Sequence, residues 1–135
     1  MKGIIAESGF WSQIEAEFGN GGGVYFLFCF DADNSIVPIS RLLGNDVEGV
    51  LYIGMATSFL NRVIELKKSL SPEHISSSHE CGARYKSHKA ISQQFPYERL
   101  AVKLFTSDNP REAERDFLQK YYAEFGELPP FNRAG

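Results

Sequence analysis

Residues 24–30 read VYFLFCF and form the longest apolar run of this 135-residue chain. Glycines precede the run, and the polar residues 31–34 (DADN) follow it. A continuous apolar run of this length, rich in aromatic residues and with turn-forming residues on both sides, is typical of a buried strand. The sequence therefore predicts a buried strand at residues 24–30.

Two more strands are predicted from shorter patterns. Residues 49–54 (GVLYIG) are a short apolar segment that ends at a glycine, and they could pair with residues 24–30 as a hairpin-like unit. Residues 98–106 (ERLAVKLFT) alternate in part between polar and apolar side chains, as a third strand would. Residues 35–48 contain proline and glycine among polar residues and are predicted to be a long loop.

Helices are predicted on both sides of the third strand. Thr57 or Ser58 can cap a helix that continues to about residue 69. Asn109 and Pro110 occupy the preferred cap and first positions of another helix. Residues 71–95 are predicted to hold a short helix and loops. The expected fold class is α/β (α+β), with a small three-stranded, mainly antiparallel sheet flanked by helices.

Size and composition favour one globular domain. The chain has 43% hydrophobic and 23% charged residues, which argues against disorder. No apolar run approaches the ~20 residues of a membrane span. The apolar stretch at the N-terminus is too short for a signal peptide and already reaches an acidic residue at position 7. Cys29 and Cys81 have no metal or redox spacing. We therefore expect a cytoplasmic protein with reduced thiols and no membrane partner.

The charge is distributed unevenly along the chain. The 14 Lys and Arg against 17 Asp and Glu give a net charge of −3, which argues against a nucleic-acid partner, because such domains are usually basic. Residues 58–92, however, carry a net charge of +3 and all three histidines, so the remainder carries −6. An acidic protein can still present one positive face. The alternative is a solvated helix surface.

One carboxylate falls on an apolar helix face. The helix that begins at residue 110 has five apolar residues on one side: Phe117, Leu118, Tyr121, Tyr122 and Phe125. At about 100° per residue, Glu114 lies at the centre of this face. A lone ionised carboxylate in a core is unfavourable unless it is paired or binds a metal ion. Alternatively, the first helical turn projects beyond the core and the carboxylate is solvated.

Arg62 has a comparable position on the preceding helix. The apolar stripe of that helix consists of Phe59, Val63, Leu66 and Leu70, and Arg62 borders this stripe. The aliphatic stem of the arginine could simply cover the edge of the core. Tyr25 and Tyr52 lie in predicted strands, where an aromatic residue usually belongs to the core, although each hydroxyl needs a partner.

Several of these residues form an ordered set. Gly23-Val24-Tyr25 is followed by Tyr52-Ile53-Gly54, then by Arg62, then by Glu114 on a late helix, and finally by Asn132 after Leu128-Pro129-Pro130-Phe131. With these motifs the chain resembles the GIY-YIG nuclease superfamily over about residues 21–132. The resemblance implies one domain over residues 1–135, with residues 1–20 as an N-terminal extension and residues 31–48 as an insertion loop.

The resemblance implies a metal-dependent endonuclease that hydrolyses phosphodiester bonds in nucleic acid, which we expect to be DNA. Glu114 would hold Mg²⁺ or Mn²⁺, since a hard cation takes oxygen ligands. Arg62 would clamp the phosphate. Tyr25 and Tyr52 would position and deprotonate the attacking water, and family members differ in which tyrosine is the base. Asn132 would order the site through side-chain hydrogen bonds.

The chain also departs from the family pattern. Many members carry Tyr or His one turn after the arginine, where this chain has Leu66. His79, in the following segment, could supply the missing group, or it could be an ordinary surface histidine of a serine-rich loop. Residues 31–48 are long for the family, and they could face the substrate.

Two other functions stay open. The chain could be a catalytically inactive nucleic-acid-binding module of the same fold. It could also be a protein-interaction domain that uses Phe10, Trp11 and Phe18 as an exposed apolar patch. Because no second domain is predicted, specificity would come from residues 31–48 or 71–95, from a protein partner or from a homodimer.

Overall fold

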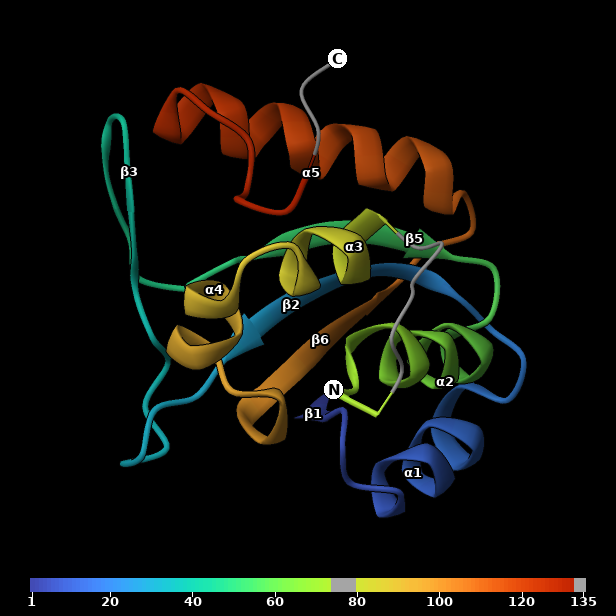
Figure 1. Cartoon of the computed structure of the whole chain (residues 1–135). Helices are drawn as coiled ribbons and strands as arrows, with labels where there is room; N and C mark the ends of the chain where they lie inside the picture. The colour runs from blue at the N-terminus through green and yellow to red at the C-terminus, as the bar shows by residue number, and fades with distance from the viewer. Residues whose placement is uncertain (74–79, 133–135) are drawn as a thin grey trace.

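The computed structural model describes residues 1–73 and 80–132 and has a mixed α/β fold (Figure 1). Strand β2 (Gly23–Cys29) lies between β6 (Leu100–Thr106) and β5 (Tyr52–Ala56), and β1 (Lys2–Ile4) pairs with the other side of β6. All of these pairs are antiparallel, and β5 forms one edge of the sheet. Six of the seven residues of β2 are buried, which confirms the predicted buried strand.

The prediction of a three-stranded sheet is wrong, because the described residues form one sheet of four strands. The additional strand is β1, whose three residues are too few to show an alternating pattern in the sequence. Strand β5 also begins later than the predicted start at residue 49. The reason is a turn in which the Gly49 N–H donates to the Asp46 carbonyl at 3.2 Å, with Gly49 in the left-handed region at φ +59°.

The predicted long loop contains a hairpin. Strands β3 (Ile39–Arg41) and β4 (Gly44–Asp46) pair antiparallel, with Arg41 opposite Gly44 and only two residues between them. Each strand has three residues, which explains why no periodicity was visible. The loop prediction for residues 35–48 is therefore wrong over these two strands.

Helices cover both faces of the sheet. Figure 1 shows α5 (Pro110–Phe125) along one face, and α1 (Gly9–Phe18), α2 (Phe59–Leu70), α3 (Glu80–Lys86) and α4 (Lys89–Gln94) on the other. The short helix η1 (Tyr97–Arg99) leads into β6. Side chains of β2 alternate between two cores: Tyr25 and Leu27 join α1, α2 and α3, whereas Val24 packs with α5. None of the helices in the described part of the chain is long and apolar enough to cross a membrane.

Local hydrogen bonds explain where the two long helices begin and end. The Ser58 hydroxyl accepts from the Asn61 N–H at 3.3 Å at the start of α2. The Asn109 side chain accepts from the Glu112 N–H at 3.3 Å at the start of α5, which ends where Gly126 adopts φ +75°. Both predicted helices are therefore confirmed.

The structure corrects two predictions about apolar surfaces. Phe10 is buried, and Trp11 and Phe18 pack against the main core, so the predicted exposed patch of these three residues is wrong. The Lys67 ammonium lies over the Trp11 ring at 4.7 Å from its centroid, which covers that ring further. On α5, Tyr121 and Phe125 are buried as predicted, but Tyr122 is 58% exposed and lies outside the apolar face.

A buried carboxylate joins the hairpin to α5. Asp46 is 2% exposed and accepts hydrogen bonds from the Val50 N–H at 2.9 Å, the Glu48 N–H at 3.0 Å and the Tyr121 hydroxyl at 2.9 Å. Burial and the hydrogen bond to Asp46 raise the pKa of Tyr121, so its hydroxyl remains a donor. At the hairpin tip, the Leu43 N–H donates to the Phe125 carbonyl at 3.1 Å. The hairpin is thus fixed against the C-terminal end of α5.

Replacing Tyr121 with Phe should lower the free energy of unfolding by about 1–3 kcal/mol, because a buried acceptor loses a donor. Urea unfolding followed by circular dichroism measures this change. Tyr122→Phe is the matched control, since it removes a hydroxyl from the exposed neighbouring ring. Equal stability of the two variants would contradict the role assigned to the Asp46–Tyr121 hydrogen bond.

Candidate functional site at the β5 edge

The two tyrosines of the ordered set lie side by side on the sheet. Tyr25 on β2 pairs with Gly54 on β5, and its ring centroid is 6.0 Å from that of Tyr52. Tyr25 is 1% exposed and Tyr52 is 8% exposed. A Cβ atom at position 54 would lie 2.5 Å from Cζ of Tyr25, closer than real contacts allow. Only glycine at position 54 therefore lets the Tyr25 phenol lie across β5.

Asn132 holds the outer edge of β5. Its Nδ2 donates to the Ile53 carbonyl at 3.0 Å, and its Oδ1 accepts from the Ile53 N–H at 2.9 Å. The Phe131 N–H donates to the Leu51 carbonyl at 2.8 Å. The segment before residue 132 therefore satisfies backbone groups that an edge strand would otherwise expose. Ile53 lies between Tyr52 and Gly54, so Asn132 is hydrogen-bonded to the backbone of the strand that carries Tyr52. Its role in ordering a catalytic site stays a prediction.

Arg62 borders the core of α2, as its spacing predicts. The stripe residues of α2 are all buried: Phe59, Val63, Leu66 and Leu70. The Arg62 side chain is 29% exposed, and its Nη1 lies 3.2 Å from a carboxylate oxygen of Glu65, whose side chain is 58% exposed. A solvent-exposed ion pair of this kind contributes little stability. The guanidinium can therefore exchange this partner for another anion at small cost.

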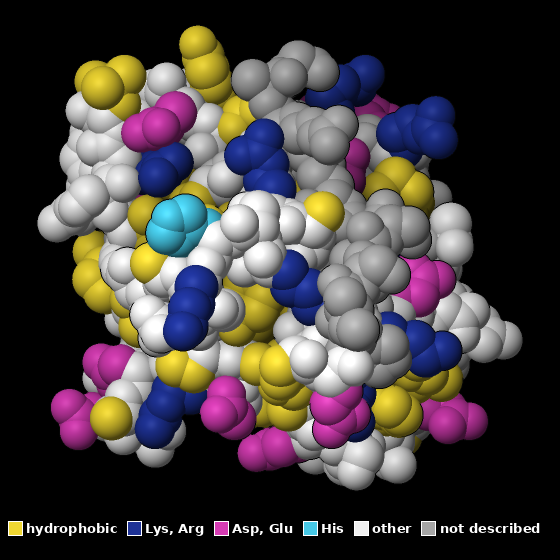
Figure 2. Space-filling model, in the orientation of Figure 1, with side chains coloured by type: hydrophobic (Ala, Val, Ile, Leu, Met, Phe, Trp, Pro, Cys, Tyr) yellow, Lys and Arg dark blue, Asp and Glu magenta, His cyan; other side chains and the backbone are white. Residues whose placement is uncertain are grey.

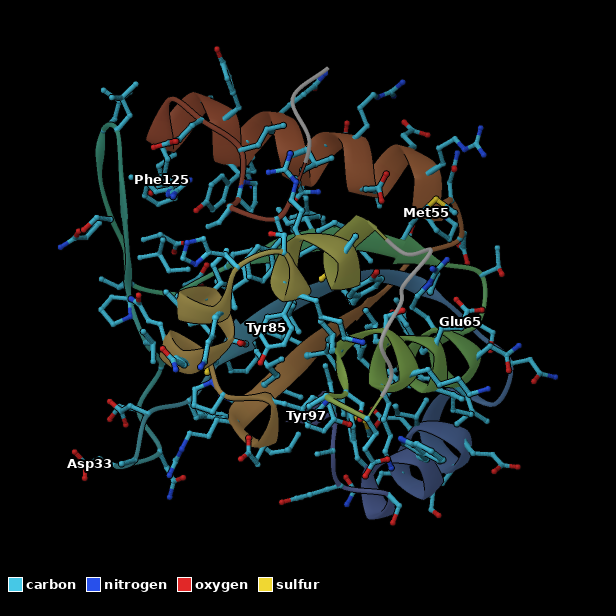
Figure 3. All side chains as sticks on the ribbon, viewed as in Figure 1. Asp33, Met55, Glu65, Tyr85, Tyr97 and Phe125 are labelled. Atoms are coloured by element: carbon cyan, nitrogen blue, oxygen red, sulfur yellow. The ribbon has the colours of Figure 1, made fainter. Side chains whose placement is uncertain are left out.

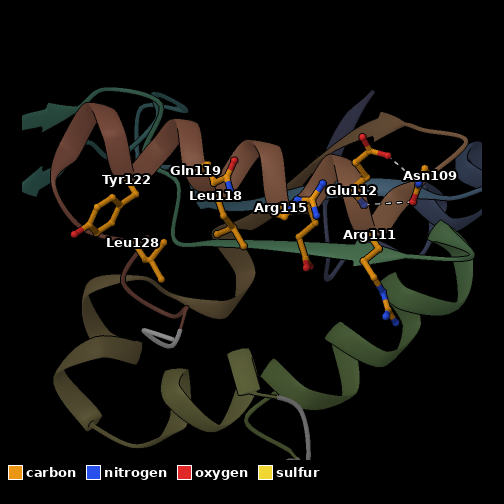
Figure 4. Close-up of a pocket in the computed structure, with 9 residues that line it drawn as sticks. Asn109, Arg111, Glu112, Arg115, Leu118, Gln119, Tyr122 and Leu128 are labelled. Carbon is orange, nitrogen blue, oxygen red and sulfur yellow. Dashed lines mark hydrogen bonds between the residues drawn. The ribbon is translucent and has the colours of Figure 1, made fainter.

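Glu114 is half-buried and lines an open pocket of about 800 Å³ on the side of α5 (Figure 4). The pocket explains how a carboxylate can lie on the same helix face as buried aromatic residues: Glu114 is open to solvent there, while Tyr121 and Phe125 are buried farther along the helix. The other lining residues are Asn109, Arg111, Glu112, Arg115, Leu118, Gln119, Tyr122 and Leu128.

Three other predicted residues influence the pKa of the Tyr25 phenol. Burial raises the pKa of the Tyr25 phenol well above its ordinary value of 10.0, and the nearby Tyr52 and Cys81 raise it further. Arg62 lowers this pKa and Glu114 raises it. Two tyrosines, an arginine and a glutamate from two strands and two helices thus lie close enough to influence one hydroxyl. At neutral pH, Tyr25 holds its proton.

Helix α3 adds a residue that the sequence gave no reason to select. Cys81 is fully buried and is among the groups that act on the Tyr25 pKa. One turn later, Tyr85 extends from α3 toward the sheet (Figure 3), and its hydroxyl donates to the Phe95 carbonyl at 2.6 Å. Leu66 is fully buried, so the position one turn after Arg62 is a core position. His79, the predicted substitute for the group missing at Leu66, lies outside the described residues.

The Glu114 carboxylate suits a hard cation that is bound by few protein side chains. Within residues 1–73 and 80–132, no group of three His, Cys, Asp or Glu side chains comes together. An ion held by Glu114 alone would take its other ligands from water and substrate. Mg²⁺ binds in this way, with one or two protein carboxylates and several retained waters. A single solvent-accessible carboxylate beside an open pocket is compatible with such an ion.

Comparisons of the chain with protein-family models, with curated proteins and with solved structures each found no match. The identity of the site therefore depends on its own geometry. Tyr25 and Tyr52 lie ring to ring, Arg62 and Glu114 both act on the pKa of Tyr25, and Asn132 is hydrogen-bonded to Ile53 on the same edge strand. These are five of the six residues that the sequence singled out.

Replacing Gly54 with Ala should lower the free energy of unfolding by about 1–3 kcal/mol, because the new methyl group would overlap the buried Tyr25 ring. Gly9→Ala is the matched control: it lies at the start of α1, and a Cβ there meets nothing within 4 Å. The control should be neutral or slightly stabilising. Equal stability losses in both variants would contradict the close contact between Tyr25 and Gly54.

The protein should lose stability as the pH rises above 10. The folded state holds the Tyr25 proton to a higher pH than the unfolded chain, so the stabilisation is present below the ordinary pKa and is lost above it. Tyr25→Phe should reduce this loss by about 1.4 kcal/mol per pH unit. Urea unfolding at several alkaline pH values measures the slope. An unchanged slope in Tyr25→Phe would contradict the raised pKa.

Proposed function

We propose that this protein is a metal-dependent endonuclease of the GIY-YIG type that hydrolyses phosphodiester bonds in nucleic acid, with DNA as the expected substrate. The observation that carries the proposal is that Tyr25 lies beside Tyr52 on the sheet and within the electrostatic influence of Arg62 and of Glu114, which lines an open pocket. A structural role alone does not require this set, because two phenols, a guanidinium and a carboxylate are costly to hold at one partly buried place.

Each residue has a role that its environment supports. Glu114 would hold the divalent cation, Mg²⁺ or Mn²⁺, which when bound polarises the phosphate and stabilises the leaving oxygen. Arg62 would bind the phosphate through its planar donors, in exchange for the exposed carboxylate of Glu65. Asn132 acts as a positioning residue, because it holds the backbone of β5 between Tyr52 and Gly54.

The tyrosines would orient the attacking water and accept its proton. Tyr25 is 1% exposed and carries its proton in the free protein, so it has to lose that proton before it can accept one from water. Arg62 lowers the pKa of Tyr25 and thereby opposes the effect of burial. Proton acceptance by a tyrosine therefore depends on cationic groups at the site. His79 is retained in this proposal as a candidate for the group that Leu66 cannot supply.

The charge distribution supports an anionic partner despite the net charge of −3. Figure 2 shows Lys and Arg side chains over the upper and middle parts of one face, with several Asp and Glu side chains among them and others along its lower border. Lys and Arg side chains on such a face attract a polyanion locally. The partner of this face is therefore proposed to be nucleic acid, met in the cytoplasm, and a homodimer or protein partner would add specificity.

The test is a cleavage assay over single-stranded, duplex and branched DNA and RNA with Mg²⁺ or Mn²⁺. Glu114→Gln and Arg62→Ala should each lower the rate by at least about 100-fold, since each removes stabilisation of the reacting phosphate. Chelation of the metal should abolish cleavage. Glu124→Gln, an exposed carboxylate on the same helix, is the control and should retain the wild-type rate.

Cleavage that persists in both purified variants would contradict the proposal. Salt-sensitive binding without cleavage on any substrate would instead support a binding module of the same fold. Thermal unfolding of each variant, measured in parallel, separates lost chemistry from lost folding.

A further inference from the structure

The pocket beside Glu114 continues along α5 as a stripe of side chains. Residues 111, 115, 118 and 122 follow one another at helical spacing on the same side of the helix, and all four line the pocket. Figure 4 shows Arg111, Leu118 and Tyr122 extending from this side, with Leu128 facing Tyr122 across the pocket. The stripe borders the buried face of α5 that carries Tyr121 and Phe125, and Leu118 also packs against that core.

The two halves of this stripe differ in chemistry. The N-terminal half carries Arg111 and Arg115, whose Cα atoms are about 6 Å apart along the helix axis. Glu112, which also lines this half, already accepts from the Asn109 side-chain amide at 3.0 Å in the helix cap. The C-terminal half carries apolar groups, Leu118, Leu128 and the Tyr122 ring. Glu114 lines the same half, so the two arginines are accompanied by two carboxylates, of which that of Glu112 is held in the helix cap. A half with two exposed arginines, followed by an apolar half with an aromatic ring, suits a ligand with both phosphates and flat rings.

Tyr122 is the distinctive residue of this surface. Its ring is 58% exposed, although it is large and partly apolar. The nearby hairpin tip adds Leu42 and Leu43, which are 74% and 64% exposed and lie against Gly126 at the end of α5. Exposed apolar groups thus gather at the C-terminal end of α5, away from Glu114. A base stacked on Tyr122 would cover its ring face.

A single strand fits these features better than a duplex does. In a duplex, both faces of a base are covered by its neighbours, so a base there could not stack on Tyr122. Duplex binding depends mainly on many contacts to phosphates, whereas this stripe offers two arginines on a protein of net charge −3. Tyr122 is about 12 Å from Glu114 along the helix, which corresponds to about three stacked nucleotides.

We propose that the α5 pocket binds a single-stranded segment of nucleic acid, with Arg111 and Arg115 on its phosphates and a base stacked on Tyr122, about three nucleotides from the phosphate at Glu114. The position of the cleaved phosphate rests on the proposed nuclease function, whereas the binding of a single strand does not. The substrate class is then a nucleic acid with an unpaired segment, such as an overhang, a gap or a branch.

The test is binding of a fluorescently labelled single-stranded oligonucleotide of mixed sequence to the full-length protein without divalent metal. Tyr122→Ala should weaken binding by about 5- to 100-fold, because one stacked base is lost. Tyr122→Phe is the matched control and should retain the affinity, since it keeps the ring. Arg111→Gln and Arg115→Gln should each reduce the dependence of log affinity on log salt by about 0.7.

The same sequence as a blunt duplex should bind more weakly and should not respond to Tyr122→Ala. The inference is overturned if the duplex binds as tightly as the single strand, if Tyr122→Ala has no effect, or if the surface captures a protein partner but no oligonucleotide. Its failure and that of the proposed function can be told apart. Cleavage with Mg²⁺ and no effect of Tyr122→Ala would overturn only this inference, whereas Tyr122-dependent binding without any cleavage would support it and overturn the nuclease proposal.

Discussion

The contact between the Tyr25 phenol and the Cα of Gly54 is the constraint on which the site depends. The two residues are opposite each other in the β2–β5 pair, and the missing side chain at position 54 leaves room for the ring. Tyr25 can then reach across the edge strand and lie beside Tyr52. Asn132 binds the outer side of the same strand: its side-chain amide accepts from the Ile53 N–H through the oxygen and donates to the Ile53 carbonyl through the nitrogen. The Tyr25 ring therefore packs against β5 from within the sheet, and Asn132 holds the same strand from its outer edge.

An edge strand is also where charges from the two helical layers can meet. Arg62 belongs to α2 on one face of the sheet, and Glu114 belongs to α5 on the other. In the middle of the sheet, the backbone of β2 and two apolar cores separate these layers. Strand β5 is the edge of the sheet, and among the described residues Phe131 and Asn132 bond to the backbone on its outer side. Charged side chains from both layers act on the Tyr25 hydroxyl there. This geometry explains why the Glu114 carboxylate and the Arg62 guanidinium can act on one hydroxyl while both remain partly exposed to solvent.

The sequence predicts the elements whose causes are local. Ser58 and Asn109 cap their helices through atoms three residues away, and β2 is apolar throughout because it is covered on both faces. The sequence does not predict strands β1, β3 and β4, because three residues are too few to show an alternating pattern. The prediction that Tyr122 is buried is wrong for another reason. A helical wheel gives the direction of a side chain but not the extent of the surface that the helix meets.

By itself, the sequence determined the buried strand, the two long helices with their caps, and an ordered set of tyrosines, arginine, glutamate and asparagine. Only the tertiary structure decided that Tyr25 lies beside Tyr52 and within the electrostatic influence of Arg62 and Glu114, since these residues are far apart in the chain. It also decided that Glu114 lines an open pocket and that the Asn132 side chain is hydrogen-bonded to the backbone of Ile53. The physical reason is that capping and burial patterns depend on neighbouring residues, whereas a site depends on how distant segments pack.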